Sequence, residues 1–110
     1  FVILSINLVW IFGIEIIKSV ADKSIRILKN EDNIKIINKS GKGGLKEYAP
    51  YDRILVSAAF KKIPENLFDQ LNNNGILVTP IKNSIFQFKK INNKIITKEF
   101  PGFVFVPIIE

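Results

Sequence analysis

PYDRILVSAAFKKIPENLFDQLNNNGILVTPI, residues Pro50 to Ile81, carries the clearest structural pattern in this 110-residue chain. Two short apolar runs within it, RILVSAA and ILVTP, predict strands that are buried on both faces. Between them, Pro64 and Glu65 suit the first turn of a helix. The apolar stripe of that helix is expected to consist of Leu67, Phe68 and Leu71. The turn-forming residues Asn72 to Gly75 are expected to end it, so the stretch predicts a strand–helix–strand unit.

The residues upstream predict a second unit of the same kind. The run VWIFGI, residues 9–14, is apolar and rich in β-branched and aromatic residues, which favours a strand. From Ile17 onward, apolar residues recur at intervals of three and four, which is typical of one face of a helix. IKIIN, Ile34 to Asn38, predicts the next strand, and the glycine-rich segment Lys39 to Pro50 predicts a loop.

Downstream, IFQFKKI, KIITKEF and FVFVPII predict three further strands, separated by Asn92-Asn93 and Pro101-Gly102. The alternation of strands and helices indicates an α/β fold with an open, mostly parallel sheet and helices on both faces. Antiparallel strands are expected to complete it at the C-terminal end. A length of 110 residues allows one domain, so residues 1–110 are expected to belong to a single domain.

Composition excludes several classes of chemistry. The chain contains no Cys and no His, which rules out disulfides, thiolate nucleophiles, Ser-His-Asp triads and the usual zinc ligand sets, so we expect no metal site. The absence of Cys is compatible with a reducing compartment, and we expect a cytoplasmic location.

The net charge of +6 raises nucleic acid as a partner, but only 2 of the 16 basic residues are Arg and no RNA-binding aromatic motif is present. We therefore expect no nucleic-acid partner. The alternative, a basic nucleic-acid binder, predicts that Lys61, Lys62, Lys89 and Lys90 gather on one face. Residues 1–17 are apolar enough to suggest a membrane segment, but Asn7 and Glu15 interrupt them, which favours buried core and no membrane contact.

Ligands of such sheets bind where the carboxyl ends of the strands open into loops. Glu15 follows the first predicted strand, where a carboxylate is suited to accept both hydroxyls of a ribose, although a helix N-terminus explains an acidic residue there equally well. Gly41 allows the close approach of a flat ring or of a backbone segment, and a plain flexible turn explains it equally well. The small residues Ser57, Ala58 and Ala59 leave space for a ligand, although close packing against a helix is the more common reason for such residues.

Pro50 to Ile81 resembles the second half of the protein-L-isoaspartate O-methyltransferases. The family pattern there is Pro-Tyr-Asp, an apolar strand, Thr/Ser-Ala-Ala, then Ile-Pro and a Leu-rich helix that leads to Gly-Gly-Arg-Leu-Val-Pro. FGIEII, Phe12 to Ile17, is similar to the family's acidic strand end, and FVFVPII, Phe103 to Ile109, is similar to its closing strand. The resemblance covers nearly the whole chain.

The resemblance implies a Rossmann-like fold and an S-adenosylmethionine-dependent enzyme. Such enzymes esterify the free carboxyl of isoaspartyl residues in damaged proteins, so isoaspartyl-containing proteins or peptides are the implied partners. By motif, Glu15 would hold the ribose of the cofactor and Ser40 and Gly41 would lie beside its adenine. Ser57, Ala58 and Ala59 would line the methyl-transfer pocket. Ser40 stands where the family has an acidic residue, a loss of about 1–3 kcal/mol in adenine binding if that group is buried.

The resemblance also implies an N-terminal truncation. The chain begins at Phe1 and contains no Met, and the family's glycine-rich motif with its strand, and its upstream substrate segment, would precede it. Phe1 to Leu8 is expected to be the end of the helix that follows that motif. The absent strand would leave two unpaired edges in the middle of the sheet, so we expect the isolated chain to be inactive. A non-catalytic remnant or binding module of the same fold is the alternative.

Overall fold

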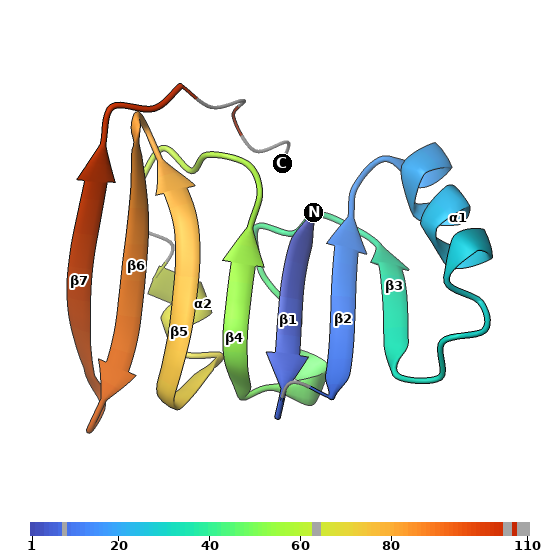
Figure 1. Ribbon diagram of the computed structural model, residues 1–110, viewed down its shortest axis with the longest axis horizontal. Helices are drawn as coiled ribbons and strands as arrows, with labels where there is room; N and C mark the ends of the chain where they lie inside the picture. Colours follow the sequence, from blue (N-terminus) through green and yellow to red (C-terminus); the bar gives the residue numbers. More distant parts are fainter. Residues whose placement is uncertain (8, 63–64, 105–106, 108–110) are drawn as a thin grey trace.

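The computed structural model describes residues 1–7, 9–62, 65–104 and 107, and these form one seven-stranded sheet with two α-helices (Figure 1). In chain order the elements are β1 (Val2–Ile6), β2 (Trp10–Glu15), α1 (Lys18–Ile27), β3 (Ile34–Asn38), the 3₁₀ turn η1 (Lys46–Tyr48), β4 (Tyr51–Val56), α2 (Glu65–Phe68), β5 (Leu71–Ile81), β6 (Ser84–Ile91) and β7 (Lys94–Pro101).

The strand order is β3-β2-β1-β4-β5-β6-β7. The pairs β2–β3 and β4–β5 are parallel, and the remaining four pairs are antiparallel. Five of the seven strands therefore run in one direction, and only β1 and β6 run against them (Figure 1). This confirms the α/β fold class, the parallel pairs and the antiparallel C-terminal strands, within a sheet that is mixed because of β1.

β1 contradicts the expectation for the N-terminal segment. Val2 to Ile6 is a strand and not the end of a helix, and it pairs with β2 on one side and β4 on the other. The two unpaired edges expected at the centre of the sheet are therefore absent. The sequence VILSI suits this place because β-branched residues favour strands, and because the flanking backbone groups of β2 and β4 need hydrogen-bond partners.

The C-terminal half differs from expectation in two places. α2 ends at Phe68, and Leu71 begins β5 instead of completing a helical stripe. Asn72 to Gly75 form an irregularity within β5, because Tyr51 pairs with Leu71 whereas Arg53 pairs with Ile76. The expected strand FVFVPII is not present at Phe103 and Val104, and residues 105, 106, 108 and 109 lie outside the described residues.

One face of the sheet, called here the covered face, holds most of the core. Its buried side chains from the strands are Val2, Leu4, Phe12, Ile14, Ile54, Val56, Leu77 and Phe88. Leu45, from the segment between β3 and β4, and Leu67 of α2 pack onto them. Tyr51 is fully buried in the same cluster, and its hydroxyl donates a hydrogen bond to the backbone oxygen of Leu45.

The opposite face, called here the open face, is less protected. Because side chains alternate along a strand, Ile3 and Leu55 point away from the covered face, and each is more than one-third exposed. α1 lies on this face over β3, where Ile25 and Leu28 share a hollow with Ile34 and Ile36. Helices thus flank both faces, as expected. Within the described residues, neither helix has the length and apolar character needed to cross a membrane.

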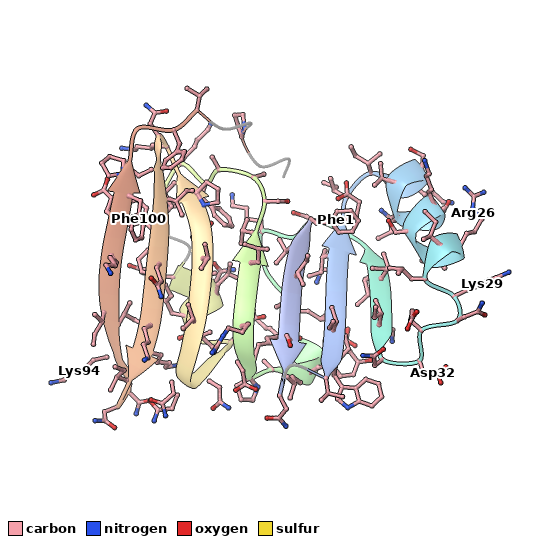
Figure 2. All side chains as sticks on the ribbon, viewed as in Figure 1. Phe1, Arg26, Lys29, Asp32, Lys94 and Phe100 are labelled. Carbon is pink, nitrogen blue, oxygen red and sulfur yellow. The ribbon has the colours of Figure 1, made fainter. Side chains whose placement is uncertain are left out.

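β7 forms one outer edge of the sheet (Figures 1 and 2). β7 carries the charged residues Lys94, Lys98 and Glu99, and it ends at Pro101. Nearly all of its residues are exposed. The long hairpins β5–β6 and β6–β7 nevertheless hold it firmly, with eight paired positions between β6 and β7.

Candidate functional site

Glu15 and Ser57 lie at the same edge of the sheet, the edge formed by the carboxyl ends of β2 and β4. Glu15 is the last residue of β2 and Ser57 is the first residue after β4. β1 begins between them, and Phe1 contacts both side chains. The N-terminal ammonium group, carried by Phe1, donates to Ser57 Oγ at 2.9 Å and lies 3.3 Å from Glu15 Oε2. Ser57 Oγ also donates to the backbone oxygen of Phe1 at 2.8 Å.

The Glu15 carboxylate is 8% exposed. Its Oε1 accepts a hydrogen bond from the backbone N–H of Ile17 at 3.3 Å, at the start of α1, while Oε2 faces Phe1. The end of β3 is tied to this position, because Asn38 Nδ2 donates to the Glu15 backbone oxygen at 2.8 Å. One carboxylate oxygen of Glu15 therefore accepts a hydrogen bond from the start of α1. The other faces the edge of the sheet where ligands of such folds bind.

Ser40 and Gly41 follow β3 in the loop beside this edge. Ser40 Oγ accepts a hydrogen bond from the backbone N–H of Lys42 at 3.3 Å, which closes a local turn. Gly41 is buried, and a Cβ added there would collide with the side chain of Val2. Gly41 therefore allows a close approach, which is one of the two interpretations given above. In this structure the neighbour that approaches it is Val2 of β1.

Ala58 and Ala59 continue from Ser57 toward the end of β5. Ala59 is buried and forms an isolated bridge with Pro107, while Ala58 is half-buried. The backbone N–H of Phe60 then donates to Pro80 at 3.0 Å, so this segment runs alongside the carboxyl end of β5. The three small residues therefore line the same edge as Glu15.

A groove of about 840 Å³ opens directly beyond Ala59, a feature that the sequence analysis did not anticipate. We call it the Lys61 groove, and the residues that define it are Lys42, Phe60, Lys61, Lys62, Ile81 and Lys82. Glu65 and Glu99 also contribute to its lining. The only signal for it in the sequence is the adjacent basic pair Lys61-Lys62.

The four lysines singled out as a test of nucleic-acid binding do not gather on one face. Lys61 and Lys62 line the groove. Lys89 and Lys90 lie toward the far end of β6, and as sequence neighbours on a strand they point to opposite faces. Lys90 Nζ donates to the backbone oxygens of Phe68 and Leu71 at 3.0 and 3.1 Å. The positive charge is therefore divided between two ends of the sheet.

A second hollow, of about 520 Å³, lies at the opposite end of β2 and includes Trp10, Phe12 and Tyr48. The rings of Phe12 and Tyr48 are stacked with centroids 4.5 Å apart, and Lys35 Nζ lies 3.0 Å from the Tyr48 hydroxyl. This hydrogen bond raises the pKa of Lys35. Trp10 is about 17 Å along β2 from Glu15, so its fluorescence is not a local probe of the Glu15 edge.

The described residues contain no cluster of three or more acidic side chains suited to hold a metal ion. The chemistry available at the edge is instead one buried carboxylate, one hydroxyl and small side chains beside a basic groove. That set is suited to bind hydroxyl-bearing and anionic groups.

Known structures place this arrangement in a fold class. The sheet superposes on a candidate protein-L-isoaspartate O-methyltransferase from Plasmodium falciparum, solved in complex with S-adenosyl-L-homocysteine, with a TM-score of 0.77, 28% identity, and coverage of 89% of this chain and 51% of that one. A second solved protein-L-isoaspartate O-methyltransferase gives a TM-score of 0.81 at 22% identity, over 90% of this chain and 34% of that one, which supports the fold alone. The fold is that of the Rossmann-like methyltransferases.

Sequence comparison then defines the family. The model of the protein-L-isoaspartate(D-aspartate) O-methyltransferase family matches residues 4–110, and the chain belongs to that family. The Fervidobacterium nodosum relative is 42% identical over 106 residues, which is 90% of this chain and 53% of the relative. The Helicobacter pylori G27 relative is 41% identical over 107 residues, which is 91% of this chain and 51% of the relative. The chain spans about half the length of the curated relatives it matches.

Proposed function

We propose that this chain is part of an S-adenosylmethionine-dependent carboxyl methyltransferase that esterifies isoaspartyl residues in damaged proteins. Family membership supports the reaction class. The observation that carries the proposal is that Glu15, at the end of β2, and Ser57, directly after β4, lie at the same carboxyl edge of the sheet. We also propose a cytoplasmic location, with which the absence of Cys is compatible.

The donor set at this edge fits the proposed cofactor. S-adenosylmethionine carries a ribose diol, an adenine ring and a methyl group that its positively charged sulfur activates. Glu15 would hold the diol through the carboxylate oxygen that now faces Phe1. Ser40 and Gly41 would lie on the adenine side, where Ser40 offers a neutral hydroxyl in place of the family's acidic group.

The substrate side requires little from the protein beyond alignment. An isoaspartyl carboxylate is ionised at neutral pH, so no strong general base is needed to make it a nucleophile. Ser57 offers one hydroxyl to orient that carboxylate, and the small side chains of Ala58 and Ala59 leave room for it. The expected contribution to rate is that of holding two reactants in line.

β1 favours a second candidate, a non-catalytic module. The backbone of Phe1 satisfies Ser57 and faces Glu15, so β1 occupies the space between the two groups that cofactor and substrate would share. We therefore expect the 110-residue chain, in the conformation described, to transfer no measurable methyl group.

A fusion protein tests the proposed function. The N-terminal half of the Fervidobacterium nodosum relative, joined ahead of Val9, should transfer labelled methyl from S-adenosylmethionine to an isoaspartyl peptide and not to its aspartyl counterpart. In this fusion, Glu15→Gln should lower kcat/KM for the cofactor about tenfold to a hundredfold, the value of a lost hydrogen bond to a charged group. Glu31→Gln, a matched change at an exposed position, should have no effect. A folded fusion without isoaspartyl methylation would contradict the proposal.

A further inference from the structure

We propose that the Lys61 groove binds an acidic segment of the polypeptide substrate, next to the residue that is methylated. This inference rests on the proposed function, because it takes the substrate to be a polypeptide. It goes beyond that function by naming a specificity site and the chemistry of the sequence that the site selects.

The groove presents lysines whose charge is available to a ligand. Lys61, Lys62 and Lys82 are exposed on its rim. Among the described residues, none of these three lysines forms an ion pair within 4 Å with Glu65 or Glu99. Glu99 Oε2 accepts a hydrogen bond of 2.6 Å from Ser84 Oγ, which also lines the groove. Carboxylates entering the groove would therefore meet three lysines that these two acidic residues do not neutralise.

The floor of the groove is apolar and held by backbone hydrogen bonds. Phe60 and Ile81 are buried, and they pair as an isolated parallel bridge. The N–H of Lys82 donates to the Phe60 oxygen at 3.0 Å, which fixes the two walls relative to each other. A volume of about 840 Å³ is in the range of pockets that take ligands of a few residues. The site is thus preformed, with an apolar floor for aliphatic stems and a basic rim for carboxylates.

The position of the groove assigns it to the substrate. It begins at Phe60, directly after Ser57, Ala58 and Ala59, on the same edge of the sheet. A polypeptide whose reacting carboxylate lies at Ser57 would pass its neighbouring residues over Lys61 and Lys62.

An acidic peptide fits these observations better than a nucleic acid. The groove continues the edge at which the carboxylate of a polypeptide substrate would lie, which favours a polypeptide as its occupant. The Phe60 ring is buried and cannot serve as a stacking platform for bases.

Peptide binding to the 110-residue chain tests the proposal without requiring activity. Two fluorescein-labelled dodecapeptides would share a central isoaspartyl residue and differ only in flanks of Asp and Glu against flanks of Ser and Gln. Fluorescence anisotropy at low salt should show about fivefold tighter binding of the acidic peptide, and the difference should shrink as sodium chloride is added. Equal binding of the two peptides would overturn the proposal.

Charge variants locate the effect. Lys61→Glu with Lys62→Glu should abolish the preference for the acidic peptide. Lys89→Glu with Lys94→Glu lowers the net charge equally at the far end of β6 and β7 and should leave the preference intact (Figure 2). If both pairs reduce the preference equally, the effect is one of net charge and the proposal fails. Circular dichroism checks folding, and Lys61→Gln with Lys62→Gln replaces the charge-reversed pair if that pair does not fold.

Two further arms separate this inference from the proposed function and from the nucleic-acid alternative. Peptides with aspartate in place of isoaspartate should keep the acidic preference, since the groove binds the flanks. If this preference persists while the fusion protein fails to methylate, the groove inference stands and the methyltransferase proposal falls. A single-stranded oligonucleotide that displaces the acidic peptide through Lys61 and Lys62 at lower concentration than unlabelled peptide would overturn the inference.

Discussion

The two faces of the sheet are built from the same strands but are protected to very different degrees. On β1, Val2 and Leu4 are buried on the covered face, whereas Ile3 between them is 39% exposed on the open face. On β4, Ile54 and Val56 are buried and Leu55 is 47% exposed. The covered face owes its protection to the loop after β3 and to α2, while α1 shields only the β3 side of the open face.

Most of the buried core therefore depends on the elements that pack onto the covered face. A long loop and a helix of four residues contribute more to the buried core than the ten-residue helix α1, whose only buried residue is Ala21. The loop can do so because Gly41 and Leu45 bring it directly onto Val2 and Tyr51. The candidate site lies at the carboxyl ends of β2 and β4, at the edge where the covered face and the open face meet.

The largest expected effect comes from comparing two neighbouring residues of β1 that lie on opposite faces of the sheet. Leu4→Ala removes a fully buried side chain and should destabilise the chain by about 2–5 kcal/mol. Ile3→Ala, one residue away on the open face, should cost less than about 1 kcal/mol. Urea unfolding followed by circular dichroism measures both. Similar costs for the two variants would show that the side chain of Leu4 does not face the core, and would contradict the position of β1 in the sheet.

A smaller effect concerns the loop that protects the covered face. Gly41→Ala places a methyl group against the Val2 side chain and should cost about 1–3 kcal/mol through overpacking. At Gly43 an added Cβ has no neighbour within 4 Å, so Gly43→Ala should be close to neutral. Thermal unfolding compares the pair. A neutral Gly41→Ala would mean that the loop lies farther from β1 than described.

A third effect, of a size similar to that of Gly41→Ala, concerns the pH dependence of the covered face. Burial raises the pKa of Tyr51 to about 12, whereas an unfolded tyrosine titrates near 10. Between about pH 10 and 12 the folded state therefore holds a proton that the unfolded state has lost, so stability should fall as pH rises, by about 2 kcal/mol from this group. The measurement is urea unfolding at several pH values across that range.

Tyr51→Phe provides the control for the pH experiment. It removes the hydrogen bond to Leu45, a loss of about 1 kcal/mol at neutral pH, and it also removes the titrating group. Subtracting its pH profile cancels the lysines that titrate in the same range. A slope that is unchanged in Tyr51→Phe would show that Tyr51 is not the group responsible.

Much of the fold could be predicted from local pattern. The run 9–14, the periodic helix after Ile17 and the strand IKIIN correspond to β2, α1 and β3 because their apolar spacing matches a strand or a helix directly. Phe1 to Leu8 could not be assigned in this way, because a continuous apolar run has no period. The family resemblance suggested a helix there, while the vacant place between β2 and β4 selects a strand.

The candidate site was predictable in position but not in surroundings. Glu15 and Ser57 could be placed at one edge because parallel strands end together. The contact that both residues make with Phe1 could not be predicted, because it follows from the antiparallel course of β1. The Lys61 groove also escaped sequence reasoning, because Lys82 joins Lys61 and Lys62 only through the pairing of Phe60 with Ile81.

The charged residues and the proline of the edge strand β7 affect how this chain can associate with other copies of itself. Lys94, Lys98 and Glu99 would each have to lose hydration before a neighbouring chain could extend the ladder, and Pro101 offers no N–H to such a neighbour. Growth of the sheet into a fibre from this edge is thereby opposed.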